Sequence, residues 1–244
     1  MPEGPSILIL REQLEPYTGK LVKAATGTAA IDYTRVAGKK IRLFMSWGKH
    51  TLICFRDCYL RIHLLMFGSY RINQQRAGMR PRLSLSMAGA ELNFYTCHVT
   101  LYEGRPETDY DWEIDVLADV WNPARALLNL KTAGKRLVCD VLLDQEIFAG
   151  CGNIIKNEVL FRSAIQPEST CKAIPLKSLK NLVKEVRAYS YDFYNWKKEG
   201  TLKRHWQVYH QRICPRCQHS LTQKHTGKGR RLSYYCPNCQ KMYS

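Results

Sequence analysis

Two Cys-x-x-Cys pairs near the end of this 244-residue chain constrain its fold more than any other feature. Cys214 and Cys217 form the first pair, Cys236 and Cys239 form the second, and 18 residues separate the two pairs. Two tight turns with this spacing can present four thiolates tetrahedrally to one zinc ion, and a closed shell of four sulfurs leaves no position for water or substrate. We therefore expect one structural zinc ion in a hairpin whose strands flank residues 228–230. The alternative is that all four are unligated core thiols.

The other six cysteines lack such a pattern. Ten cysteines in an intracellular chain do not indicate a disulfide framework, and buried thiols are the simpler interpretation for the six. They are Cys54, Cys58, Cys97, Cys139, Cys151 and Cys171.

Charge indicates a polyanionic partner. The chain has 37 basic and 21 acidic side chains, a formal net charge of +16. Residues 197–244 contain eleven Lys or Arg and one acid, so most of the excess lies near the end of the chain. A basic segment can also be only a solvated face, but this concentration favours polyanion binding. Residues 106–123 hold six acids and no base, which predicts a surface connector turned away from a phosphate ligand.

The sequence also predicts where the chain resides. Its hydrophobic fraction of 45% can supply real cores, but no apolar run reaches the ~18 residues needed to cross a bilayer. The first apolar stretch is broken by Arg11 and Glu12 and has no basic leader, unlike a signal peptide. We expect a monomer with no membrane association that is cytoplasmic (associated with the nucleoid, if bacterial) or otherwise intracellular.

The pattern of apolar residues changes near residue 122. After an opening helix at about 6–14, short strands predict an antiparallel β-sandwich. Beyond Asn122 the periodicity is helical, which predicts a second domain that ends in the zinc hairpin. The predicted strands cover 39–45, 50–55, 59–65, 69–72, 82–87 and 91–95; the predicted helices cover 124–129, 135–144, 154–162 and 176–194. The expected fold class is α+β, with a catalytic β-sandwich domain at 1–105, a linker at 106–122, a helical domain at 123–206 and a zinc finger at 207–244.

Pro2 and Glu3 form a candidate catalytic pair. Methionine is normally trimmed before proline, which would leave a secondary amine at the chain start. A generic α-amino group titrates near 7.7–8, so about a tenth is neutral at pH 7, against less than ~0.1% of a lysine. Such an amine can attack a sugar carbon and form an iminium ion that acidifies the neighbouring hydrogen. By itself, Glu3 is more simply an acid that complements a helix dipole.

Five motifs in order resemble those of the formamidopyrimidine-DNA glycosylase and endonuclease VIII family of base-excision repair enzymes. The motifs are Met1-Pro2-Glu3-Gly4-Pro5, Gly48-Lys49, His63-Leu64-Leu65-Met66-Phe67-Gly68, Gly150-Cys151-Gly152-Asn153-Ile154, and the hairpin with Arg231. The resemblance implies a β-sandwich, a helix-two-turn-helix domain and a zinc finger. It also implies a bifunctional glycosylase and lyase that acts on double-stranded DNA containing a damaged base or an abasic site.

The resemblance assigns catalytic roles by position. Pro2 would attack C1′ of the damaged nucleotide, and Glu3 would donate and shuttle protons. Lys49 would hold a phosphate beside the lesion, although a surface lysine is its default interpretation.

DNA-binding roles follow in the same way. Asn153 lies at a helix start, where backbone N–H groups can receive a phosphate, although an ordinary N-cap with a glycine-assisted turn is the alternative interpretation. Arg231 would contact phosphates around the flipped nucleotide. Leu65, Met66 and Phe67 would form an intercalating wedge, although periodicity alone would place them in the sandwich core. His63 would serve structure or phosphate contact.

Three departures from the family bear on substrate and rate. The segment before the zinc finger is short, and no Asp-Pro-Arg-Arg-Phe-Gly segment is present; both absences favour the endonuclease VIII branch and oxidised pyrimidines. Ser6 stands where relatives usually have a glutamate. A catalytically silent DNA-binding paralogue and a zinc-ribbon RNA-binding protein are the alternative functions, the first supported by Ser6 and opposed by Pro2 and Glu3.

Overall fold

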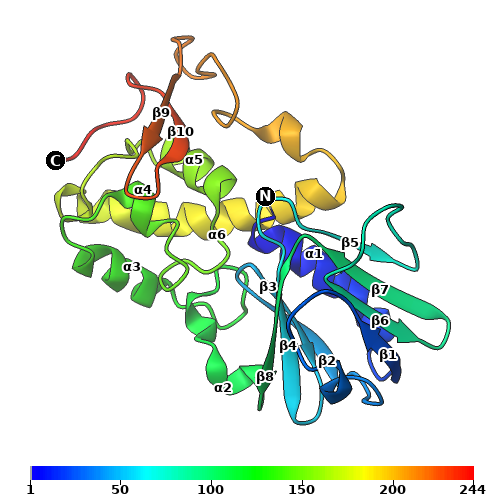
Figure 1. Cartoon of the computed structure of the whole chain (residues 1–244). Helices are drawn as coiled ribbons and strands as arrows, with labels where there is room; N and C mark the ends of the chain where they lie inside the picture. Colours follow the sequence, from blue (N-terminus) through cyan, green and yellow to red (C-terminus); the bar gives the residue numbers. More distant parts are fainter. Residues whose placement is uncertain (1) are drawn as a thin grey trace. The chain divides into compact units, whose positions relative to one another are not determined.

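A computed structural model describes residues 2–244, and the chain divides into two units, residues 1–111 and 112–244 (Figure 1). The α+β class is confirmed, because the first unit consists mainly of antiparallel strands and the second mainly of helices. The expected loss of Met1 concerns a residue outside the described range. The described helices include none that is both long and apolar enough to span a membrane.

Unit 1 is an antiparallel β-sandwich. Its two sheets have the strand orders β1-β6-β7-β5 and β2-β3-β4-β8. Apolar side chains of both sheets, including Phe44, Leu60, Leu85 and Phe94, belong to one buried cluster, so the sheets share a core. The strands are β1 (Val22–Thr26), β2 (Leu43–Trp47), β3 (His50–Cys54), β4 (Cys58–His63), β5 (Ser69–Ile72), β6 (Leu83–Met87), β7 (Ala90–Tyr95) and β8 (His98–Glu103).

The opening helix α1 (Gly4–Leu14) packs against β2 and β3. Ile7, Leu10 and Leu14 recur at helical spacing and are fully buried in the sandwich core. Pro5 lies in the first turn, where its missing N–H has no intrahelical partner to lose. The packing fixes the chain start against one sheet.

The acidic stretch 106–123 is more structured than a surface connector. It begins with helix α2 (Pro106–Asp109) in unit 1, and Glu107 pairs with Arg42. Farther on, Ile114 and Val116 are buried, and Val116 belongs to the core of unit 2. The expectation of a surface segment is therefore wrong for its centre.

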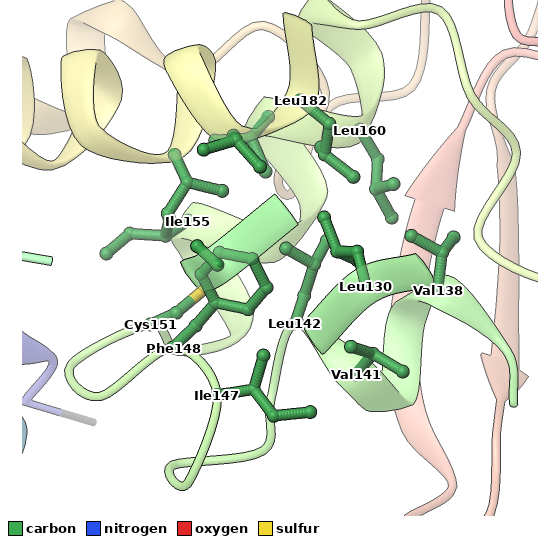
Figure 2. Packing of buried hydrophobic residues seen from close by; sticks show 14 of the residues in the cluster. Leu130, Val138, Val141, Leu142, Ile147, Phe148, Cys151, Ile155, Leu160 and Leu182 are labelled. Carbon is green, nitrogen blue, oxygen red and sulfur yellow. The ribbon is translucent and has the colours of Figure 1, made fainter. Parts of the chain in front are cut away.

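Helices α3 (Pro123–Thr132), α5 (Asn153–Arg162) and α6 (Leu176–Lys198) surround the core of unit 2. Figure 2 shows Leu130, Leu142, Phe148 and Leu160 within this core. The short helix α4 (Val138–Val141) is the exception to the prediction of a helix over 135–144. Leu137 has extended backbone angles and bridges Thr170, so the helix starts late.

The hairpin predicted around residues 228–230 is confirmed. Strand β9 (Thr222–Thr226) pairs antiparallel with β10 (Arg231–Tyr235), and β10 packs against α5.

Candidate functional site

Pro2 and Glu3 lie at the start of α1. Glu3 is the N-cap residue, and its carbonyl oxygen accepts hydrogen bonds from the N–H groups of Ser6 (2.8 Å) and Ile7 (3.3 Å). The Glu3 side chain makes no capping hydrogen bond, although the residue is only 1% exposed. Its buried carboxyl group is therefore next in sequence to the proline without being used as the cap of this helix.

Lys49 lies in the tight turn between β2 and β3, where Gly48 has a φ of 53°. The register of the sheet pairs His50 on β3 with His63, the last residue of β4. Lys49 and the loop that follows His63 therefore lie at the same end of one sheet. Because α1 packs against β2 and β3, this sheet also carries the helix whose N-cap is Glu3.

Two histidines at this end of the sheet are held neutral. Burial, helped by Arg61, His63 and Lys49, lowers the pKa of His50 to about 3. Burial and the positive charge of Lys49 also lower the pKa of His63. The two rings meet edge to face with their centroids 5.5 Å apart. A His63 ring with a lowered pKa is poorly suited to act as a general acid near neutral pH.

The loop after β4 exposes the three predicted wedge residues. Leu65 is 45% exposed, Met66 51% and Phe67 79%. Leu65 has a φ of 53°, and a Cβ atom on Gly68 would lie 1.9 Å from the carbonyl oxygen of Leu64. The backbone of the loop thus depends on glycine at position 68. The interpretation of these three side chains as sandwich core does not hold.

Asn153 and Arg231 lie together in unit 2. Asn153 is the first residue of α5, Arg231 is the first residue of β10, and both line a hollow of about 290 Å³. Asn153 donates from Nδ2 to the carbonyl oxygen of Leu232 (3.0 Å), and its buried Oδ1 accepts no hydrogen bond from any described residue. No acidic side chain is among the residues lining the hollow, so it is suited to an anion. Its lining is Asn153, Tyr209, His210, His225, Arg230, Arg231, Leu232 and Tyr234.

Polar groups on α5 hold the hairpin in place. Lys156 is fully buried and donates to Ser233 Oγ (2.8 Å), and Asn157 Oδ1 accepts from the backbone N–H of Tyr234 (2.8 Å). Neither Lys156 nor Asn157 was among the predicted site residues. The only signal in the sequence is that Lys156, Asn157 and Glu158 are consecutive polar residues within a mostly buried helix, and this pattern does not identify the groups that they bind.

Glu158, also fully buried, fixes the segment that precedes the first cysteine pair. Its carboxylate accepts backbone N–H groups of Gln207, Val208 and Tyr209 at 2.8–3.1 Å. Burial raises the pKa of Glu158, and the three backbone hydrogen bonds oppose that shift.

The tip of the hairpin is anchored by Asp140 of α4. Its Oδ2 accepts from the backbone N–H of Lys228 at 3.0 Å. Gly227 has a φ of 69°, and a Cβ atom there would lie 2.1 Å from the Asp140 carboxylate. The contact therefore requires glycine at this position.

The four predicted ligand cysteines converge at the base of the hairpin. Their sulfur atoms all lie within 4.8 Å of one another, with 3.5 Å between those of Cys217 and Cys236 and 3.8 Å between those of Cys214 and Cys239. A tetrahedral site with bonds of ~2.3 Å would separate its sulfurs by about 3.8 Å. The thiol set therefore fits one metal ion of that geometry.

The predicted site residues fall into two groups. Unit 1 carries Pro2, Glu3, Lys49, His63 and the wedge, and unit 2 carries Asn153, Arg231 and the four cysteines. The six other cysteines are all buried, as expected.

Comparison with known proteins gives concordant matches. Residues 1–97 match the formamidopyrimidine-DNA glycosylase N-terminal domain, and residues 118–189 match the formamidopyrimidine-DNA glycosylase H2TH domain. Endonuclease 8-like 3 of Mus musculus is 34% identical over 237 residues, which cover 91% of this chain and 39% of that protein. Endonuclease 8-like 2 of Bos taurus is 34% identical over 201 residues, which cover 76% and 59%. The chain thus spans less than two thirds of these relatives.

Solved structures share the fold. A Lactococcus lactis formamidopyrimidine-DNA glycosylase, bound non-covalently to DNA with an abasic site, has a TM-score of 0.87 at 21% identity, covering 98% of this chain and 99% of that one. A viral DNA glycosylase has a TM-score of 0.85 at 20% identity, covering 98% and 100%.

Proposed function

Because the chain belongs to the formamidopyrimidine-DNA glycosylase and endonuclease VIII family, we propose that it is a DNA-repair glycosylase with abasic-site lyase activity. The observation that carries this proposal is the buried carboxyl group of Glu3 directly after Pro2, on a helix packed against the sheet that bears Lys49. A secondary amine, a proton donor and a cation are the three groups that the reaction requires.

The reaction proceeds by covalent catalysis. The Pro2 nitrogen attacks C1′ while the bond from C1′ to the damaged base breaks, and the base leaves with a proton. Glu3 protonates the ring oxygen as the sugar opens, which leaves an iminium ion between Pro2 and C1′. The iminium withdraws electrons, so a proton is lost from C2′ and the bond from C3′ to its phosphate oxygen breaks. While the iminium ion persists, loss of a proton from C4′ can break the bond from C5′ to its phosphate oxygen in a second elimination, and water then hydrolyses the iminium ion and restores the amine of Pro2.

Lys49 binds the phosphate beside the lesion. Its charge is close enough to His63 to contribute to the lowered pKa of that ring, so the end of the sheet is electropositive. A point-like ammonium at this position stabilises a phosphate without requiring a fixed hydrogen-bond geometry.

The exposed loop supports the extrusion of the damaged nucleotide. A base within a duplex is out of reach of a chain terminus, so it must leave the stack. Leu65, Met66 and Phe67 present apolar surface that can enter the base step and stabilise the kink.

Unit 2 binds the DNA backbone. Arg231 donates to a phosphate in the hollow that it shares with Asn153, and the first N–H groups of α5 add the positive end of the helix dipole. One structural zinc ion, held by Cys214, Cys217, Cys236 and Cys239, would fix the base of the hairpin that carries Arg231. The zinc ion takes no part in the sugar chemistry.

Oxidised pyrimidines are the preferred lesions in this proposal. The short connection between α6 and the first cysteine pair, which includes only a 3₁₀ turn at Leu202–His205, provides no long loop to cover an oxidised purine. The chain also has no Asp-Pro-Arg-Arg-Phe-Gly segment, which contacts the opposite base in the family members that act on oxidised purines.

Borohydride trapping tests the covalent step. The chain with a free Pro2 is incubated with an abasic-site duplex and sodium borohydride, and peptide mapping locates the adduct. We expect a crosslink at Pro2, and nicking of the strand in chelator without added cofactor. A matched form extended by one residue ahead of Pro2 lacks the secondary amine and should give neither product.

Two glutamates of the first helical segment test the proton shuttle. Glu3→Gln should lower turnover by about 100-fold or more, whereas Glu15→Gln, on an exposed residue, should leave it unchanged. Tight binding of the abasic duplex without crosslink or nick would instead support the silent DNA-binding alternative.

A further inference from the structure

His210 has a backbone conformation that is costly for a histidine. Its φ is 56°, in the left-handed region that glycine adopts freely and most other residues avoid. Non-glycine residues in this region concentrate at functional sites, where the side chain has a purpose that offsets the strain. A purpose for the His210 side chain should therefore be visible in its contacts.

The ring of His210 is fixed by a buried tyrosine. The Nδ1 atom lies 2.9 Å from the hydroxyl oxygen of Tyr234, which is 3% exposed. That hydroxyl oxygen also accepts a hydrogen bond from Gln223 Nε2 (3.4 Å), so its own hydrogen is available for His210 Nδ1. The edge of the ring also meets Tyr209, with centroids 4.4 Å apart.

The direction of this hydrogen bond and the tautomer of the neutral ring are linked. When Nδ1 accepts the tyrosine hydrogen, the ring hydrogen resides on Nε2. His210 is exposed and lines the same hollow as Arg231 and Asn153, and no described residue forms a hydrogen bond with its Nε2. An N–H donor on a fixed ring thus adds to the cationic lining of the hollow.

We propose that His210 is a direct DNA contact, whose Nε2–H donates a hydrogen bond to the phosphate that Arg231 binds. The inference rests on the proposed function, because it takes the ligand of the hollow to be a DNA phosphate. His210 fixes the position of this phosphate, and Arg231 supplies the charge.

Replacement by glycine separates binding from stability. His210→Gly removes the donor and relieves the left-handed strain, which offsets the loss of the hydrogen bond to Tyr234, so the free energy of unfolding should change by no more than ~1 kcal/mol. We expect its affinity for a duplex with a tetrahydrofuran abasic analogue to fall about tenfold, the loss expected for a hydrogen bond to a charged group. Ala164→Gly is the matched control, because Ala164 has the same φ of 56° and does not line the hollow. It should keep the parent affinity.

Two further variants decide between explanations. Arg231→Ala should weaken binding strongly, and its combination with His210→Gly should lose less than the two single effects together, because both residues hold one phosphate. Parent affinity in Arg231→Ala would overturn the phosphate assignment of the proposed function. Weak binding in Arg231→Ala with parent affinity in His210→Gly would overturn this inference alone. Tyr234→Phe should reduce affinity less than His210→Gly does. Equal losses of affinity in the two variants would mean that His210 acts only by positioning Tyr234, and this result would overturn the proposal.

Discussion

The Nδ1 atom of His63 accepts a hydrogen bond of 3.2 Å from the backbone N–H of Leu65. The bond requires an unprotonated Nδ1, which the lowered pKa of His63 provides. It closes the first turn of the loop in which Leu65 has a positive φ and Gly68 approaches the Leu64 carbonyl group. The sheet end thereby fixes the loop while leaving its three apolar side chains exposed.

Substitution of the exposed wedge should affect activity without affecting stability. Met66→Ala and Phe67→Ala remove side chains that are mostly in solvent, so the free energy of unfolding should change by no more than ~0.5 kcal/mol. The rate of excision of a damaged base from a duplex should fall about tenfold or more, because the apolar side chains that stabilise the unstacked base step are lost. Excision from a single strand, which has no stacked partner, should fall much less. Parallel excision assays on the two substrates measure the difference.

Leu64→Ala is the control for the wedge variants. Leu64 is adjacent but 3% exposed, so its truncation should cost about 2–5 kcal/mol in urea unfolding. Equal losses on duplex and single-stranded substrates for Met66→Ala would count against the wedge.

The fold was largely predictable because each element has a local signal. Ile7, Leu10 and Leu14 predict α1 from spacing alone, and the cysteine pairs predict the hairpin. The prediction of a helix over 135–144 was too long, because Leu137 is drawn into a bridge with Thr170, a contact that no local pattern reveals. Burial of Val116 likewise depends on the core of unit 2, so the acidic composition around it was misleading.

Acid should destabilise unit 1 through His50. The pKa of His50 is about 3 in the folded chain, against an ordinary value near 6.5. Between these values the unfolded chain binds a proton that the folded chain does not, so the free energy of unfolding falls as the pH falls. Lowering the pH from 7 to 5 should cost about 1–2 kcal/mol through this residue. Urea unfolding at both pH values measures this decrease in the free energy of unfolding. In His50→Gln the decrease should be smaller by the contribution of His50. An identical pH dependence in the variant would contradict the assignment.

Loss of the metal should disable unit 2. Cys239→Ala, or treatment with a strong chelator, should lower the zinc content from one ion per chain to near zero, because the remaining thiolates no longer close the shell. The hairpin should then loosen, and affinity for the abasic duplex should fall as Arg231 loses its position. Elemental analysis and DNA titration measure the two effects. Cys171→Ala, at a buried cysteine outside the cluster, should retain the zinc ion. Loss of the ion in Cys171→Ala, or retention of the ion in Cys239→Ala, would argue against the four-cysteine site.

The site was only partly predictable, for a physical reason. Residue types with distinctive chemistry, such as Pro2 and the paired cysteines, are recognisable in sequence. The residues that position the β9–β10 hairpin act through backbone groups: Asn157 through the N–H of Tyr234, and Asp140 through the N–H of Lys228. Backbone N–H groups are present in any sequence, so the amino-acid sequence alone does not identify which side chain will bind a particular one.

Glu158 provides a direct test of how a buried side chain positions the backbone near the site. Its carboxylate accepts three backbone N–H groups of residues 207–209, the segment that leads into His210. Glu158→Gln removes the charge and directs an amide N–H₂ group at some of those donors, which should cost roughly 2–3 kcal/mol in urea unfolding. Affinity for the abasic duplex should fall with it, because Tyr209 and His210 lose their fixed positions. Glu113→Gln is the control, since Glu113 pairs with Arg125 at 3.3 Å, both side chains are nearly half exposed, and such a pair should contribute no more than ~1 kcal/mol. Comparable destabilisation in the two variants would show that the buried carboxylate is not specifically required by the segment it binds.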